Sequence, residues 1–470
     1  MSEGRLARPS DPLGEPAATL ALLGTLTVLV WLGATDSWSL FAVTLALTTA
    51  LVAARRHWVL APLLTFAFLM PLPFPMWYSL VGEGTFSLLS RVHPGTLFLL
   101  ALLAFGWRPS LDTAPPVLSP TLAGERLLAG LQTVFVVVVG GMSVAQRGLR
   151  GLPLLLDNFI GPFVLYWLAL WAFRSRLQTR TATGAIAAGL GVLLGVIGVI
   201  EFAAGRNPLY EPFYGEVPWF PYPTGEYRST LTFGAPLAAA NALLLLLVAV
   251  TSASALSARV VGVLFILAGV LTTGSRSAAA LAVGASMFVV LGLGEGNRTF
   301  ESLRSKRALA IGLGTFAAAL CLLVTPLGDV VLHRVLGSWQ STAVRVLSAE
   351  YFQQSAGNYV THGVGLGGST DVSTAALGSY VTFENPWIML AVDVGIPLAA
   401  FYLCMLVSVV IVGLRWRPRR WAVLLTAFVL VVMESAYNAF GVRSLAGYDL
   451  WMALAFVWPD KASYTAATRS

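Results

Sequence analysis

The sequence predicts an all-α, polytopic membrane protein with about twelve to fourteen transmembrane helices and a large folded extracytoplasmic loop. Of the 470 residues, 57% are hydrophobic and only 11% are charged, and the mean hydropathy is +0.78. A soluble globular protein carries about 25% charged residues. Apolar runs of membrane-spanning length also recur along the whole chain. Helices suit such runs, because a helix satisfies its own backbone hydrogen bonds in lipid.

The apolar runs give the elements in order. A transmembrane helix needs roughly 17–25 mainly apolar residues. The expected spans are 17–34, 38–54, 58–74, 94–107, 126–146, 153–173, 182–204, 231–251, 259–274, 276–294, 308–326, 386–413, 420–440 and 445–458. The runs at 94–107 and 445–458 are short, and prolines within 71–75 end the third span early.

These spans divide the chain into six parts. We expect a cytoplasmic N-terminal tail (1–16), N-terminal transmembrane helices (17–204), central transmembrane helices (205–325), a large extracytoplasmic loop (326–385), C-terminal transmembrane helices (386–458) and a cytoplasmic tail (459–470). Arginine placement sets this orientation, because cytoplasmic loops are enriched in Lys and Arg. The large loop far exceeds the usual connection of about 4–6 residues, so we expect it to be folded, with a helix over 341–354.

Charge and cysteine content exclude other classes. The net charge of +7 is dispersed among short loops and not massed in one basic domain, so no nucleic-acid partner is expected. Cys321 and Cys404 both lie in predicted membrane helices, which makes a disulfide framework improbable.

One arginine lies between two apolar runs. The stretch 272–279 is TTGSRSAA, and it separates the run 260–271 from the run 278–293. A charged side chain at a membrane boundary is costly unless it meets an anion or an interfacial partner. Arg276 is therefore a candidate ligand of a phosphate group, with an interfacial anchor as the alternative.

Four further stretches join TGSRSA (273–278) in a fixed order. They are YRSTLTFGAP (227–236), STAVR (341–345), HGVGLGG (362–368) and FENPWIMLAVDVGIP (383–397). Together they resemble the signature stretches of the O-antigen ligase/polymerase superfamily of bacterial envelope glycan enzymes. The resemblance covers the C-terminal half well, and the first 200 residues match in hydropathy alone.

The resemblance implies a metal-independent membrane glycosyltransferase without a cofactor, in the bacterial inner (plasma) membrane with an extracytoplasmic active site. The implied partners are a polyprenyl-diphosphate-linked glycan donor, a glycan acceptor, the lipid bilayer and other polysaccharide-assembly proteins. Negative charge develops on the diphosphate as it leaves, and arginine forks stabilise such charge. Arg228, Arg276 and Arg345 are therefore the expected catalytic arginines.

An acceptor hydroxyl needs a base, or a group that orients it. Glu384 is the expected catalytic carboxylate, with His362, His333 and Glu350 as alternatives. Ligases of the family carry a His-Asn pair where this chain has Glu384-Asn385, which favours an O-antigen or exopolysaccharide polymerase over a ligase that transfers glycan to lipid A core. The expected substrate-binding residues are Ser275, Ser277, His362, Gly365, Gly367, Asn385 and Tyr222. The four histidines are scattered, so no metal site is predicted.

Other interpretations stay open at this stage. Arg228 and Arg345 are also explained as ordinary loop arginines, and Glu384 as an acidic residue near a helix N-terminus. Glu201 and Asp393 lie within or at the ends of spans, where they suit a cavity wall, a helix terminus or a proton relay. A transporter or flippase is the rival class, although no internal repeat is visible, and a non-catalytic scaffold is a third.

Overall fold

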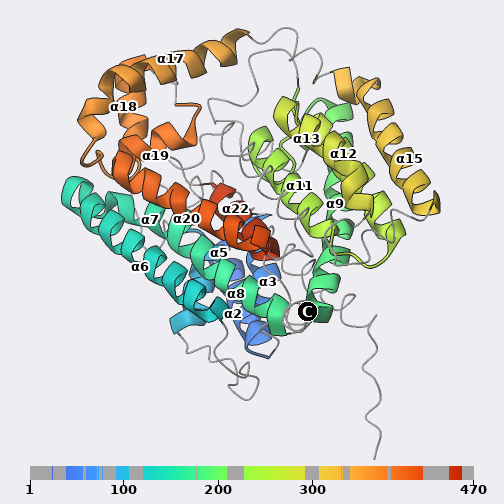
Figure 1. The fold of residues 1–470 in the computed structure, drawn as a ribbon, viewed down its shortest axis with the longest axis horizontal. Coiled ribbons are helices and arrows are strands. Elements are labelled where there is room, and N and C mark those ends of the chain that lie inside the picture. The colour runs from blue at the N-terminus through green and yellow to red at the C-terminus, as the bar shows by residue number, and fades with distance from the viewer. Residues whose placement is uncertain are drawn as a thin grey trace, which may run out of the picture.

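Figure 1 shows the computed structural model, which describes residues 39–56, 60–70, 92–104, 120–175, 177–208, 227–291, 306–329, 339–377, 383–415 and 444–457, with single residues 24, 72, 77 and 331. These residues are mostly helical, and no strand occurs among them. The predicted all-α class is thus confirmed for the described part of the chain.

The helices of the first half are mostly apolar throughout. They are α2 (Ser39–Arg56), α3 (Ala61–Leu69), α5 (Pro94–Ala104), α6 (Pro120–Arg147), η4 (Gly148–Gly151), α7 (Leu152–Leu155), η5 (Leu156–Ile160), α8 (Gly161–Ser175) and α9 (Leu177–Ala204).

The helices of the second half range from 4 to 20 residues in length. They are α11 (Pro236–Val250), α12 (Leu256–Thr272), α13 (Arg276–Leu291), α15 (Lys306–Leu323), α17 (Trp339–Ser355), η6 (Ala356–Tyr359), α18 (Gly368–Leu377), α19 (Pro386–Val394), α20 (Ile396–Arg415) and α22 (Ala446–Val457). The helix expected over 341–354 is confirmed as α17.

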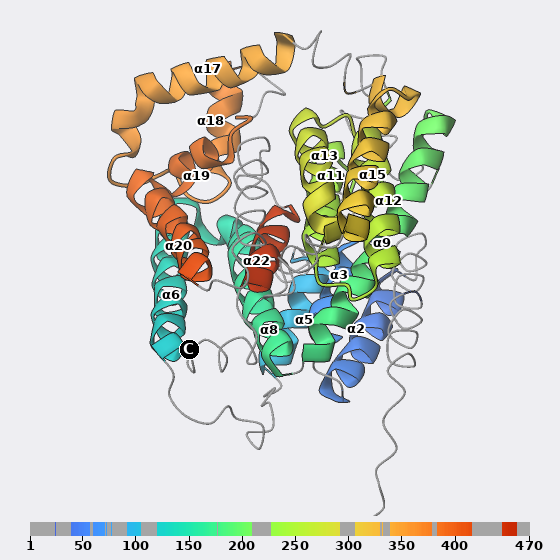
Figure 2. The same cartoon turned by 45° about the vertical axis from the view of Figure 1, so that its right-hand side comes forward.

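Three helical stretches are long and apolar enough to cross a membrane: Gly124–Phe173, Arg180–Ala204 and Ile396–Leu414. The first is not one straight helix. The irregular turns η4, α7 and η5 separate α6 from α8, which run in opposite directions (Figure 2). Shorter apolar helices accompany these stretches. The larger number of spans remains a prediction.

The predicted run 386–413 is wrong as a single span. Gly395 separates α19 from α20. Its φ of +88° is not helical, and glycine adopts such a conformation readily because it has no Cβ, so the helix breaks there. The run 231–251 also begins late, at Pro236, because Leu231 and Gly234 both have positive φ and form a turn. The predicted spans 17–34 and 420–440 lie outside the described residues, apart from residue 24.

Most of the long helices gather in two groups. Helices α9, α11, α12, α13 and α15 stand side by side, and α6, α8, α20 and α22 stand beside them (Figure 2). Helix α17 lies across the top of this view, and packs on α18, α19 and η6.

Helices α9 and α12 run parallel and pack closely on each other. A Cβ on Gly195 would lie 2.2 Å from the carbonyl oxygen of Phe265, and one on Gly191 would lie 2.5 Å from Ile266 Cγ1. At the C-terminal end of α12, a Cβ on Gly198 would lie 2.9 Å from Thr272 Oγ1. Small residues let two apolar helices approach closely. The glycines of α9 therefore let its backbone pack directly against α12.

Candidate functional site

The turn that carries Arg276 is a tight helix-to-helix connection. Helix α12 ends at Thr272, and Gly274 has φ +62°, so the chain reverses at once into α13. Arg276 is the first residue of α13 and is half-buried, while Ser275 just before it is buried. The first N–H groups of a helix have no partner inside that helix and favour anions. A guanidinium group at this position adds positive charge to an end that is already positive.

Arg228 lies on the same turn although it comes from a different segment. Its Nε donates a hydrogen bond to the carbonyl oxygen of Thr273 at 2.8 Å, and the neighbouring Ser229 N donates to the carbonyl oxygen of Thr272 at 2.9 Å. The hydroxyl of Ser229 donates to the carbonyl oxygen of Gly198 in α9 at 3.0 Å. The segment that carries Arg228 is thus fastened between the ends of α9 and α12.

Glu201 of α9 fastens the same segment from the other side. This carboxylate is 1% exposed. Its Oε1 accepts hydrogen bonds from the Tyr227 hydroxyl at 2.6 Å, from Thr230 N at 2.8 Å and from the Thr230 hydroxyl at 3.1 Å. Its Oε2 accepts from Leu231 N at 2.8 Å. From the sequence, Glu201 suits a cavity wall, a helix terminus or a proton relay, and none of these is an anchor for the Arg228 segment. The visible signal was a carboxylate one turn before the end of an apolar span.

Arg345 and Glu384 form a second pair. Arg345 Nε lies 3.3 Å from Glu384 Oε2, and the two side chains are 39% and 37% exposed. Phe383 is fully buried and stacks on Tyr351 of α17, with ring centroids 5.6 Å apart. Because Phe383 anchors the chain against α17, the adjacent Glu384 lies beside Arg345 on that helix.

Two other groups near this pair have roles apart from the chemistry. The Asn385 side chain caps α19, because its Oδ1 accepts from Trp387 N at 2.9 Å and from Ile388 N at 3.2 Å. Burial, with a contribution from Tyr351, raises the pKa of Tyr359 to about 12. The Tyr359 phenol is therefore neutral at ordinary pH.

The glycine-rich turn 363–368 is docked on α19 by its backbone. Gly365 N donates to the Asp393 carbonyl oxygen at 2.8 Å, and the Asp393 carboxylate accepts from Gly367 N at 3.1 Å and Ser369 N at 2.6 Å. Gly365 and Gly367 have φ of +88° and +81°. A Cβ on Gly363 would lie 2.3 Å from the Asp393 carbonyl group. These glycines thus allow tight docking, and Asp393 acts as a cap for α18.

The other predicted site residues lie in several different settings. Ser277 is half-buried in the first turn of α13. His362 is exposed, and its Nδ1 lies 2.8 Å from the Thr361 hydroxyl. Glu350 is exposed on α17. Tyr222 and His333 lie outside the described residues. The four predicted catalytic residues therefore fall into two pairs, Arg228 with the Arg276 turn and Arg345 with Glu384.

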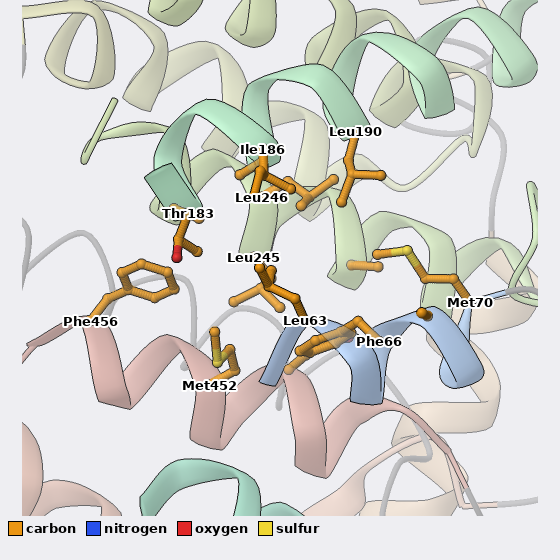
Figure 3. Close-up of a pocket in the computed structure, with 15 residues that line it drawn as sticks. Leu63, Phe66, Met70, Thr183, Ile186, Leu190, Leu245, Leu246, Met452 and Phe456 are labelled. Atoms are coloured by element: carbon orange, nitrogen blue, oxygen red, sulfur yellow. The ribbon is translucent and has the colours of Figure 1, made fainter. Parts of the chain in front are cut away.

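A separate cavity of about 70 Å³ lies among α3, α9, α11 and α22 (Figure 3). Leu63, Phe66, Leu245 and Met452 line it, so its wall is mainly apolar. One acidic residue, Asp449, also lines it, is 1% exposed, and has no hydrogen-bond partner on either carboxyl oxygen. The predicted catalytic arginines are not part of this wall, so the cavity is not the anion site.

Among the described residues, no three His, Cys, Asp or Glu side chains gather in a way that could hold a metal ion. No family model matches this chain, and no curated protein and no solved structure matches it significantly.

Proposed function

We propose that this chain is a membrane glycosyltransferase that polymerises polyprenyl-diphosphate-linked oligosaccharide repeat units on the extracytoplasmic face of a bacterial inner membrane. The observation that carries the proposal is the 2.8 Å hydrogen bond from Arg228 Nε to the Thr273 carbonyl oxygen. It brings an arginine from 45 residues away to the turn that leads into Arg276. Two guanidinium groups beside a helix N-terminus suit a diphosphate, which offers several anionic oxygens.

The apolar helices fit such a donor. A polyprenyl chain stays in the bilayer and presents its diphosphate at the interface, so the enzyme needs an anion site at the end of membrane-spanning helices. The Arg276 turn lies at the end of two apolar helices, α12 and α13.

In the proposed reaction, an acceptor hydroxyl oxygen attacks the anomeric carbon of the donor sugar. The bond between that carbon and the diphosphate oxygen breaks, and the diphosphate leaves with the electron pair. Arg228 and Arg276 stabilise the charge that develops on it. The hydroxyl proton passes to the carboxylate of Glu384, which Arg345 orients through their 3.3 Å contact.

The identity of residue 384 supports polymerisation over ligation. The ligases that this chain resembles have a histidine at this position, and here a glutamate occupies it. Asn385 caps α19 and is committed to that helix. A ligase that transfers glycan to lipid A core or to another acceptor is the nearest alternative within the same chemistry.

The test replaces the cell's own copy with Arg276→Ala or Arg228→Ala and follows polymer length and the location of lipid-linked units. We expect short or absent polymer, with single lipid-linked repeat units on the outer face. Arg259→Ala is the matched control, because Arg259 Nε donates to the Ala253 carbonyl oxygen near the start of α12. It should give normal polymer.

Two outcomes would overturn the proposal. Units trapped on the cytoplasmic face of the arginine variants would indicate a flippase. Polymer of normal length from both Arg228→Ala and Arg276→Ala would indicate a scaffold without catalytic arginines.

A further inference from the structure

Glu201 gathers donors from a single short segment. Four donor groups, on Tyr227, Thr230 and Leu231, bond to its two carboxylate oxygens at 2.6–3.1 Å. Hydrogen bonds to a charged acceptor are among the stronger ones in proteins. Both oxygens are occupied, so the geometry favours an anchoring role over a proton relay.

The anchored segment has an unusual backbone. Leu231 has φ +52°, and it is the only non-glycine with positive φ among the described residues. A bulky residue adopts this conformation only where its surroundings impose it. Glu201 Oε2 accepts the N–H of Leu231, and the Asn207 amide donates to its carbonyl oxygen at 2.9 Å. The Glu201 carboxylate thus binds the N–H group of Leu231, and the Asn207 amide binds its carbonyl group.

The same segment places Arg228. Residues 228 and 229 bond to the carbonyl oxygens of Thr273 and Thr272, at the end of α12. Arg228 is therefore set between two supports, Glu201 on α9 and the end of α12. Without Glu201, the N–H groups of Thr230 and Leu231 would lose their acceptor, and Asn207 would be the remaining support of these two residues. We expect the guanidinium group of Arg228 then to leave the turn that carries Arg276.

We infer that Glu201 is a positioning residue that holds Arg228 on the Arg276 turn for the diphosphate group of an isoprenoid lipid. The inference rests on the proposed function for its ligand. It assigns Glu201 no contact with that ligand. Glu201 acts through Tyr227, Thr230 and Leu231.

The test is a double-mutant cycle on the affinity of the full, detergent-solubilised chain for geranylgeranyl diphosphate. Arg228→Ala should weaken binding about ten-fold, the scale expected for a hydrogen bond to a charged group. Glu201→Gln puts an amide NH₂ where donors already point, and should weaken binding by a similar factor. The double variant should bind no more than about two-fold more weakly than Arg228→Ala, because Glu201 acts through Arg228.

Asp393→Asn is the matched control. Asp393 is another buried carboxylate that accepts backbone N–H groups, but it holds a different turn. Whatever its effect on affinity, the factor should be the same with and without Arg228. Melting temperatures separate loss of stability from loss of affinity. If Glu201→Gln does not fold, Tyr227→Phe removes one donor and should weaken binding in the wild-type background alone.

The failures are distinguishable. If the wild-type chain binds geranylgeranyl diphosphate no better than geranylgeraniol, the proposed anion site is wrong. If Arg228→Ala weakens binding but Glu201→Gln has no effect, or an effect that multiplies fully with that of Arg228→Ala, the site stands and the role of Glu201 is wrong.

Discussion

The contact between α9 and α12 predicts a strong effect of one added methyl group. In Gly195→Ala the new Cβ would lie 2.2 Å from the Phe265 carbonyl oxygen, whereas ordinary contact begins at 3.4 Å. Helix α9 must therefore move by roughly 1 Å, and overpacking of this kind costs about 1–3 kcal/mol. Gly189→Ala is the control on the same helix, because its Cβ would meet nothing within 4 Å. There the alanine should stabilise the helix by about 0.5–1 kcal/mol.

The assay is thermal unfolding of both variants in the same detergent, followed by geranylgeranyl diphosphate binding. Gly195→Ala should melt a few degrees below Gly189→Ala, given the shift expected per kcal/mol. It should also bind more weakly, because Glu201 is six residues further along α9 and a 1 Å shift would stretch its 2.8 Å bond to Leu231. A Gly195→Ala chain as stable as Gly189→Ala would refute the close parallel packing of α9 on α12.

Two more predictions concern carboxylates in different settings. Because Glu384 and Arg345 are both more than a third exposed, their pairing adds at most about 1 kcal/mol. Glu384→Gln should therefore melt like wild type yet polymerise about 100-fold more slowly. The control is Asp371→Asn, which removes the carboxylate that lies 2.8 Å from Arg147 Nη1 and should keep the wild-type rate. An unchanged rate for Glu384→Gln would remove Glu384 from the chemistry. Asp449→Leu should raise the free energy of unfolding by about 1–3 kcal/mol, because it removes a buried carboxyl group without a hydrogen-bond partner. Asp157→Leu should lower the free energy of unfolding, because Asp157 accepts a hydrogen bond from the Thr96 hydroxyl at 2.6 Å. A melting temperature lowered by Asp449→Leu would show that the Asp449 carboxyl group has a hydrogen-bond partner.

Helix positions were largely predictable, because apolar length depends on the local sequence alone. The run 182–204 corresponds to α9, and 276–294 to α13. The break at Gly395 was missed because both flanking segments are apolar, so hydropathy is continuous across it. The turn before Pro236 was missed because the positive φ of Leu231 depends on Glu201, about 30 residues away.

The candidate site was only partly predictable. Arg276 was singled out by its place between two apolar runs, because a charge there is costly without a role. Arg228, Arg345 and Glu384 were singled out only because their stretches resemble those of a known family. Which of them meet depends on tertiary packing. Sequence spacing could not show that the Arg228 side chain bonds to the end of α12, or that Glu201 anchors its segment.

The most direct test of the central claim uses the purified chain alone in proteoliposomes, with a synthetic polyprenyl-diphosphate-linked oligosaccharide as both donor and acceptor. The account predicts products that grow by whole repeat units with release of polyprenyl diphosphate, and loss of both in Arg276→Ala. Intact substrate after incubation with a folded wild-type chain that binds it, or equal product from Arg276→Ala, would contradict the account.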